Sequence, residues 1–166
     1  MRVRVFIGIG SNVGDRRAQC VAAEAHLRRL ACTDVLRISH LIETQAAEGV
    51  TGGPFLNGVA EVGTALAPLD LLCALQAIEA ALGRPRGHCP GTARTMDLDI
   101  LLYGDRVVRE MGLAIPHPRM AQRRFVLEPL VAIAPDVRHP VLNLTAADLL
   151  RRLELAESSD RASLMP

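Results

Sequence analysis

The chain has no lysine: every one of its 19 basic residues is an arginine. This absence excludes two kinds of chemistry. A P-loop places a lysine on the nucleotide phosphates, and Schiff-base catalysis needs a side-chain amine. If this protein handles phosphate, arginine must make the contacts.

A strong positive charge and long apolar runs are missing as well. The net charge of +1 argues against sequence-independent binding of nucleic acid, which uses a strongly basic face. No apolar run approaches the roughly 20 residues of a membrane-spanning helix, and we expect no signal peptide because strand-like alternation begins at once. We therefore expect a cytoplasmic protein that binds neither nucleic acid nor a membrane.

Cysteines and aromatic residues are few. The 4 cysteines show neither a C-x-x-C pair nor zinc-ligand spacing, and we expect them to be buried free thiols. They are Cys20, Cys32, Cys73 and Cys89. With no Trp, 1 Tyr and 3 Phe, few rings are left to hold a flat ligand. Phe55 and Phe125 both lie near predicted loops, where each could be a core residue or a ligand clamp.

The order of predicted elements indicates one domain, 1–166, with a flexible tail from about residue 157. Periodicity and breaker residues predict strands over 1–9, 35–43, 55–62 and within 93–104. They predict helices over 15–30, 68–82, 125–134 and 146–153. The order β-α-β-β-α-β is typical of an α+β ferredoxin-like sandwich, with one largely antiparallel sheet, helices on one face and C-terminal additions.

Two aspartates interrupt the strand within 93–104. Alternation predicts Leu98, Ile100 and Leu102 on the core face. It predicts Asp97 and Asp99 on the other face, roughly 7 Å apart at Cβ. Two such carboxylates repel each other, and Mg²⁺ between them would relieve that repulsion while also binding substrate phosphates. The alternative is a solvent-facing strand edge with two acids of no function.

Basic residues lie on both sides of the aspartate strand. They are Arg84, Arg86 and Arg94 in the Gly/Pro-rich segment 83–94, and Arg119, Arg123 and Arg124 after His117. Each arginine alone would be an ordinary surface residue, but together with two carboxylates they suit a polyphosphate and its metal. His117 stands between two prolines and could hydrogen-bond a phosphate or nucleotide. We expect 83–94 to be a lid that orders when both substrates bind.

Glu79 falls within the apolar arc of the helix predicted over 68–82. An inward carboxylate needs a partner, and we expect that partner to be a ligand. The alternative is an acid at the edge of the arc that reaches outward to water.

Several short motifs follow one another in a fixed order. They are I-G-S-N (9–12), F-L-N (55–57), I-E (78–79), G-R-P-R (83–86), R-T-M-D-L-D-I-L (94–101), I-P-H (115–117) and R-R-F (123–125). In this order they resemble the 6-hydroxymethyl-7,8-dihydropterin pyrophosphokinases of the folate pathway, over nearly the whole chain. The R-T-x-D-L-D-I-L core is highly specific, whereas G-S-N alone would be weak.

The resemblance implies a ferredoxin-like fold and transfer of pyrophosphate from MgATP to the pterin hydroxymethyl group, with release of AMP. It implies a monomer whose partners are ATP and the pterin. It assigns Mg²⁺, as two ions bridging the ATP phosphates, to Asp97 and Asp99. The implied ATP contacts are Arg84, Arg86, Arg94, His117 and Arg123, and the implied catalytic residues are Arg84, Arg94, Asp97 and Asp99.

For the pterin, the resemblance implies that Phe55 and Phe125 sandwich the ring. Asn57 and Glu79 would hydrogen-bond its amino-pyrimidinone edge, and Thr44 would close the pocket.

The chain departs from the family pattern in two places. H-C-P-G-T-A (88–93) replaces the usual Arg-Trp-Gly-Pro, and T-Q-A-A (44–47) lacks the usual prolines. Two other functions stay open at this stage. One is a catalytically weakened pterin- or nucleotide-binding module of the same fold, and the other is a two-metal phosphodiesterase that uses Asp97 and Asp99.

Overall fold

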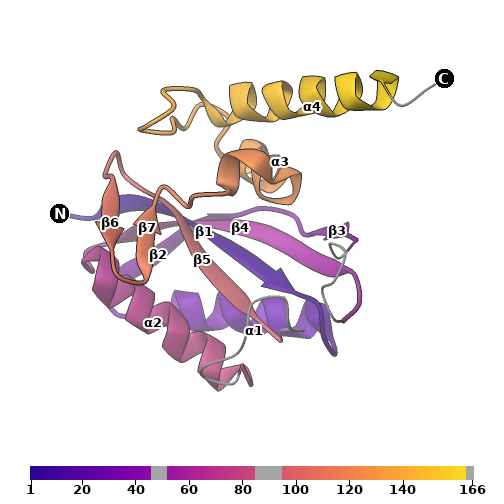
Figure 1. The fold of residues 1–166 in the computed structure, drawn as a ribbon. Helices are drawn as coiled ribbons and strands as arrows, with labels where there is room; N and C mark the ends of the chain where they lie inside the picture. Colours follow the sequence, from indigo (N-terminus) through magenta and orange to yellow (C-terminus); the bar gives the residue numbers. More distant parts are fainter. Residues whose placement is uncertain (46–51, 85–94, 164–166) are drawn as a thin grey trace.

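The protein is described by a computed structural model over residues 1–45, 52–84 and 95–163. Its main sheet contains β1 (Val3–Ser11), β2 (Thr33–Ile38), β3 (Ile42–Thr44), β4 (Phe55–Thr64) and β5 (Asp97–Tyr103). The strand order is β2-β4-β1-β5, every pairing is antiparallel, and β3 also pairs with β4. This order confirms the predicted ferredoxin-like α+β fold (Figure 1).

Helices cover both faces of the sheet. Helices α1 (Arg16–Arg28) and α2 (Pro68–Ala81) lie against one face, over a core that includes Val5, Ile7 and Leu75. The C-terminal additions lie on the other face: the 3₁₀ turn η1 (Met120–Gln122), α3 (Arg124–Ile133) and, above α3, α4 (Ala146–Ser163).

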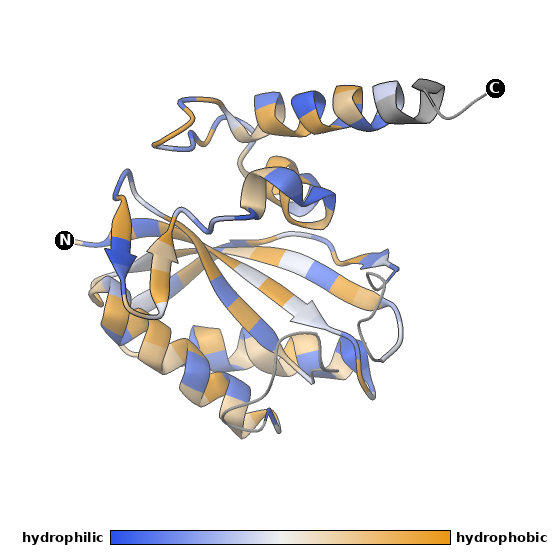
Figure 2. Cartoon of the chain, viewed as in Figure 1, coloured by the Kyte–Doolittle hydropathy of each residue, from blue (hydrophilic) through white to orange (hydrophobic). Residues whose placement is uncertain are grey.

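The strands carry apolar residues over most of their length, interrupted by single polar residues (Figure 2). The residues 5–9 of β1 are almost all buried, as expected for a strand covered on both faces. None of the helices in the described part of the chain is long and apolar enough to cross a membrane.

The strand predicted over 35–43 is two strands, β2 and β3. Ser39 lies between them, and its hydroxyl accepts a hydrogen bond from the backbone N–H of Val59 at 2.9 Å. The same hydroxyl donates to the His40 carbonyl at 2.8 Å. The Ser39 N–H still bonds to the Val59 carbonyl at 2.9 Å, but the hydroxyl replaces the reciprocal backbone bond, and regular pairing with β4 resumes at Ile42.

The prediction for the buried face of β5 was correct for two residues and wrong for the third. The β1–β5 register shifts by one residue, so that Ile7 faces Ile100 whereas Phe6 faces Leu102. Leu98 and Ile100 lie in the core below α1 and α2, but Leu102 packs with Phe6 in the core below α3. A β-bulge thus reverses the alternation beyond Ile100.

Two elements differ from the predicted outline. A hairpin of β6 (Val108–Glu110) and β7 (Leu113–Ile115) was not predicted, because its strands are too short for periodicity to reveal. The last helix, expected to end at Leu153, continues to Ser163, so the residues from Glu157 to Ser163 are helical.

The prediction for the thiols was correct only for Cys20, which is buried in α1. Cys32 and Cys73 are exposed. Cys32 lies in a tight turn with φ 58°, and Cys73 lies on the outer side of α2, so neither enters a core. Cys89 lies outside the described residues.

Candidate active site

Three strands place the predicted site residues around one glycine. In the sheet register Gly10 of β1 faces Asn57 of β4 on one side and Asp97 of β5 on the other. A Cβ added to Gly10 would lie 3.3 Å from Asn57 Oδ1, 3.9 Å from Asp97 Cβ and 4.0 Å from Phe55 Cδ1. A side chain here would crowd the space between the proposed pterin and metal residues. Close approach rather than an unusual φ therefore favours glycine at this position.

Asn57 and Thr44 form a second part of the site. Asn57 is buried, and its Nδ2 donates a hydrogen bond to Thr44 Oγ1 at 2.8 Å. The contact joins β4 to β3, in which Thr44 pairs with Phe55. The structure thus brings together Thr44, Phe55 and Asn57, all three of which we had associated with the pterin.

Asp97 and Asp99 lie on the α3 side of the edge strand β5. In the β1–β5 register, Asp97 faces Gly10 and Asp99 faces Gly8. Because both β1 residues are glycines, no β1 side chain stands directly opposite either aspartate. Burial, and then the charge of Asp97, raise the pKa of Asp99 to about 6, although Arg123 and Arg84 act against that rise. The pair therefore resists carrying two negative charges, and a cation would relieve this repulsion.

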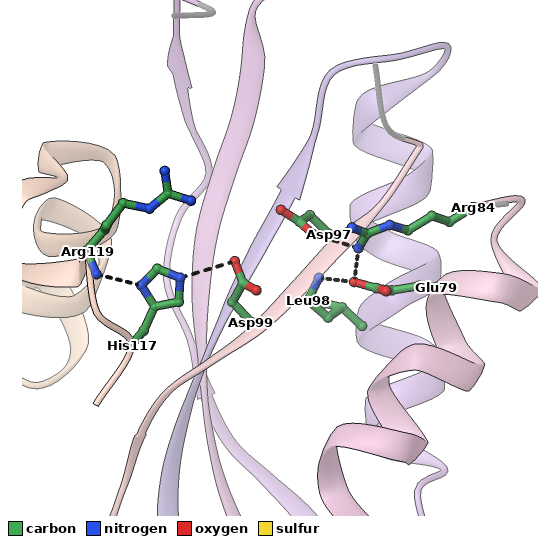
Figure 3. Close-up of polar contacts among 7 residues, drawn as sticks. All are labelled: Glu79, Arg84, Asp97, Leu98, Asp99, His117 and Arg119. Carbon is green, nitrogen blue, oxygen red and sulfur yellow. Dashed lines mark hydrogen bonds and ion pairs between the residues drawn. The ribbon is translucent and has the colours of Figure 1, made fainter. Parts of the chain in front are cut away.

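His117 faces the aspartates from the segment after β7 (Figure 3). Its Nε2 lies 4.0 Å from Asp99 Oδ2, and its Nδ1 accepts a hydrogen bond from the Arg119 backbone N–H at 3.2 Å. Burial, together with Arg123 and Arg119, lowers the pKa of His117 to about 4. At neutral pH the ring is therefore uncharged. With Nδ1 accepting, the proton sits on Nε2 and is available as a donor toward Asp99 or a ligand beside it.

Two consecutive arginines at the start of α3 have different surroundings. The Arg123 guanidinium carbon lies 5.4 Å from the centroid of the Phe125 ring, and the charge of Arg123 acts on both Asp99 and His117. Arg124 instead contacts Glu128 on its own helix, and Glu154 and Glu157 on α4. Of the two, only Arg123 faces the aspartates.

Glu79 faces inward as predicted, and its carboxylate has partners within the protein, while its expected contact with a ligand stays a prediction. Glu79 Oε1 accepts a hydrogen bond from the Leu98 backbone N–H at 2.7 Å and also binds Arg84. Arg84 Nη1 in turn lies 2.7 Å from Asp97 Oδ1 (Figure 3). Burial raises the pKa of Glu79, and the contacts with Leu98 and Arg84 act against that rise.

The remaining predictions concern residues that the structure leaves out. Arg86 and Arg94, and with them the lid predicted over 83–94, lie mostly or wholly outside the described residues. Sequence reasoning gave no role to Gly8 or to the Arg119 amide. Gly8 pairs with Asp99, so a predicted pairing of β1 with β5 could have identified it. The hydrogen bond from the Arg119 amide to His117 depends on the turn that follows His117, which the sequence pattern does not show.

The donor set fits a magnesium ion that is shared with a substrate. Outside the gaps at 46–51, 85–94 and the last three residues, no group of three or more His, Cys, Asp or Glu side chains could hold a metal ion. Two neighbouring carboxylates are the usual protein contribution to a Mg²⁺ that completes its shell with water and phosphate oxygens. The fit is therefore to a metal–nucleotide complex rather than to a metal held by protein alone.

Comparisons with known proteins agree with one another. A family model described as 7,8-dihydro-6-hydroxymethylpterin-pyrophosphokinase (HPPK) matches residues 6–135. A Pseudomonas aeruginosa protein named 2-amino-4-hydroxy-6-hydroxymethyldihydropteridine pyrophosphokinase is 44% identical over 137 residues, which are 82% of this chain and 84% of the relative. Folic acid synthesis protein fol1 of Schizosaccharomyces pombe is 38% identical over 148 residues, which are 89% of this chain but 20% of that protein.

Among solved structures, a triple mutant of Plasmodium falciparum HPPK-DHPS with pteroate is similar at a TM-score of 0.76. The similarity covers 99% of this chain and 45% of that chain, at 14% sequence identity. This chain therefore spans less than half of the length of that protein, and the likeness shows the fold alone.

Proposed function

The chain belongs to the 7,8-dihydro-6-hydroxymethylpterin-pyrophosphokinase family, and from this premise we propose how its residues serve the reaction. The enzyme transfers pyrophosphate from ATP to the hydroxymethyl group of 6-hydroxymethyl-7,8-dihydropterin in folate biosynthesis. The hydroxymethyl oxygen forms a bond to the β-phosphorus of ATP and loses its proton. The bond from that phosphorus to the oxygen bridging to the α-phosphorus breaks, and AMP leaves.

One observation carries the assignment of the metal site. Asp97 and Asp99 share one side of an edge strand at two glycine positions of β1, and burial, followed by the charge of Asp97, raises the pKa of Asp99. We assign to this pair the Mg²⁺ that accompanies ATP, as two ions. When bound, Mg²⁺ neutralises phosphate charge and helps to hold the phosphates in line.

The basic residues around the pair would hold the phosphates. Arg84 and Arg123 supply positive charge from the two sides of β5, and neutral His117 supplies a donor on Nε2. In a water-poor site, fixed donors of this kind favour the charge that develops on the transferred group. Arg86 and Arg94 are assigned to ATP, and Arg94 to catalysis, on the sequence motif alone.

On the other side of Gly10, Asn57 and Thr44 would recognise the polar edge of the pterin. The Asn57 side chain is held by Thr44, so its oxygen and remaining N–H are oriented before a ligand binds. Phe55 lies beside Gly10, and Phe125 lies beside Arg123, where each could cover one face of the ring. For Glu79 the contacts favour a role that concerns Arg84 rather than the pterin.

A coupled assay for AMP tests the proposal. We expect AMP from the full chain only when ATP, Mg²⁺ and 6-hydroxymethyl-7,8-dihydropterin are all present. Binding of both substrates without AMP would indicate the weakened binding module, and cleavage of nucleic acid would indicate the phosphodiesterase. The family match favours neither alternative. A monomeric state and a cytoplasmic location remain predictions, testable by light scattering and by fractionation.

A further inference from the structure

Glu79 contacts the metal and phosphate side of the site, not the pterin side. From these contacts we infer that Glu79 is a positioning residue, which holds Arg84 and the strand between the two aspartates in place for MgATP. The inference rests on the proposed function, because it presumes that Arg84 and the aspartates serve ATP.

The end of α2 places Arg84 next to Glu79. The Arg84 N–H bonds to the Glu79 carbonyl at 3.0 Å, and the Gly83 N–H bonds to the Ala80 carbonyl at 3.1 Å. These two bonds, with Gly83 at φ 87°, form a Schellman motif. The chain therefore turns back at Gly83, and the Arg84 side chain meets the Glu79 carboxylate one turn earlier.

The Glu79 carboxylate also fixes the edge strand. Its Oε1 accepts the N–H of Leu98, the residue between Asp97 and Asp99. Within the residues that the structure describes, β5 is an edge strand, and this N–H points to the side without a neighbouring strand. One buried oxygen thus binds both the phosphate-side arginine and the backbone between the two proposed metal ligands.

The Arg84 guanidinium is shared by two carboxylates, and this sharing gives Glu79 a role when substrate binds. Arg84 Nη1 contacts both Glu79 and Asp97 (Figure 3). If Asp97 turns its oxygen to a metal ion, Glu79 remains as the anion that keeps Arg84 in position. Arg84, Glu79 and Asp97 have side chains only 12%, 10% and 20% exposed, so water screens these interactions weakly.

The geometry separates Glu79 from the residues proposed for the pterin. Glu79 reaches the outer edge of β5 from α2, on the sheet face opposite α3. Asn57 and Thr44 lie on the far side of β1 from β5, beyond Gly10. Two donors of the protein bind Glu79 Oε1, so this oxygen is engaged on the side of Arg84 and β5.

The test measures AMP formation by the full chain and by Glu79→Gln, with ATP, Mg²⁺ and pterin varied in turn. The glutamine oxygen still accepts the Leu98 N–H but has no charge for Arg84. We expect kcat to fall about 10- to 100-fold, while the calorimetric Kd for pterin stays within about twofold. Glu110→Gln, the same change at an exposed position of β6, is the matched control and should change neither quantity.

A rise in the pterin Kd of about tenfold or more, with kcat unchanged, would overturn the inference and assign Glu79 to the pterin. Coupling to Arg84 gives a second test. In an Arg84→Ala background, Glu79→Gln should lower kcat by at most about twofold more, because the pair acts as a unit. Losses that multiply would show that Glu79 acts independently of Arg84, a result that a merely structural role would give.

If Glu79→Gln does not fold, nitrogen-15 NMR of the parent protein answers the same question. We expect restricted rotation of the Arg84 guanidinium both without ligands and with Mg²⁺ and a non-hydrolysable ATP analogue. Averaging like that of exposed Arg109 would contradict the inference. A parent protein that forms no AMP would refute the proposed function, whereas the Arg84 signal would still report on the pair.

Discussion

Two arginine–carboxylate clusters lie on the sheet, one across β1, β4 and β2 and the other at the edge strand β5, and they differ in which charge is in excess. In the first, Glu61 of β4 sits between two arginines: Arg4 Nε is 2.6 Å from one of its oxygens and Arg37 Nε is 2.9 Å from the other. In the second, Arg84 sits between Glu79 and Asp97, with Asp99 close by. The first has more cations than anions, and the second, among the described side chains, has more anions than cations.

The Glu61 cluster links the strands β1, β4 and β2 to the end of α3. Arg37 of β2 also donates to the Ile133 carbonyl at the end of α3, at 2.6 Å, and the Arg4 guanidinium lies 4.9 Å from the Phe6 ring centroid. Glu61 is buried, while its two arginines are about half exposed and keep contact with water. The buried charge is therefore fully compensated, and the cluster needs nothing further to bind.

The Glu79 cluster differs because its three acids, including Asp99, outnumber the two arginines, Arg84 and Arg123, that act on them. Burial, and then the charges of Asp97 and Glu79, raise the pKa of Asp99 in this arrangement. Buried ion pairs occur in both clusters, so their presence does not reveal function. The sign of the excess charge does indicate function. An excess of negative charge beside a phosphate-binding arginine suits a metal cation that is brought by the nucleotide.

The largest expected effect comes from the aspartates. Asp97→Asn and Asp99→Asn should each lower AMP formation by about 100- to 1000-fold, because the charge that holds the metal is lost. Without metal the two variants should differ. Asp99→Asn removes repulsion and should raise the melting temperature, whereas Asp97→Asn also breaks the contact with Arg84 and should not. Asp105→Asn, on an exposed turn, serves as the control, and full activity in either active-site variant would disprove the metal assignment.

Glu61→Gln tests the other side of the comparison. It should lower the free energy of unfolding by about 1–3 kcal/mol, since two arginines lose their shared anion while both can still reach water. Urea unfolding measures this loss. The KM values and kcat should stay near those of the parent at a temperature where both are folded. A specific loss of kcat without loss of stability would mean that Glu61 also belongs to the site.

Asn57→Ala should affect the pterin alone. The change should weaken pterin binding by about 2 kcal/mol, because polar groups at the ligand edge would be buried without a partner. Calorimetry with pterin, and separately with an ATP analogue and Mg²⁺, distinguishes the two halves of the site across Gly10. Equal losses for both ligands would show that the halves are not separate.

The smallest effect concerns pH. Because the pKa of Asp99 is raised to about 6, Mg²⁺ must compete with a proton below that pH. Mg²⁺ affinity should fall by up to about tenfold per pH unit as pH drops below 6. For the metal-free protein the sign is opposite. The folded state holds this proton more tightly than the unfolded chain, so the contribution of Asp99 to stability is lost as pH rises from about 4 through 6. Asp99→Asn should remove both dependences, and persistence of either would point to another group.

Local patterns predicted much of this molecule. Apolar alternation in β1 and the helical stripes around it defined the element order, and that order allows few folds. The same alternation placed Asp97 and Asp99 together on the α3 side of β5. It failed where one residue changes the geometry: Ser39 interrupts a strand, and the bulge in β5 turns Leu102 to the other face.

The protein groups that contact Glu79 could not be predicted from sequence periodicity. Its contacts depend on a turn at Gly83, on a backbone N–H in an edge strand 19 residues away, and on an arginine whose direction follows from that turn. Sequence periodicity shows which way a side chain points, but not which groups from other elements meet it. With hindsight, a glutamate four residues before a glycine and five before an arginine at a helix end is the usable signal.

The most direct test compares thermal stabilisation by Mg²⁺ with a non-hydrolysable ATP analogue in three proteins: the parent, Asp99→Asn and Glu61→Gln. Ligands that bind the folded state raise the melting temperature, and the rise grows with the logarithm of ligand concentration over Kd. If the negative surplus at β5 exists for the metal–nucleotide complex, the Mg²⁺-dependent part of the rise should be present in the parent, undiminished in Glu61→Gln and absent in Asp99→Asn. The same Mg²⁺-dependent rise in Asp99→Asn as in the parent would contradict this explanation of the site.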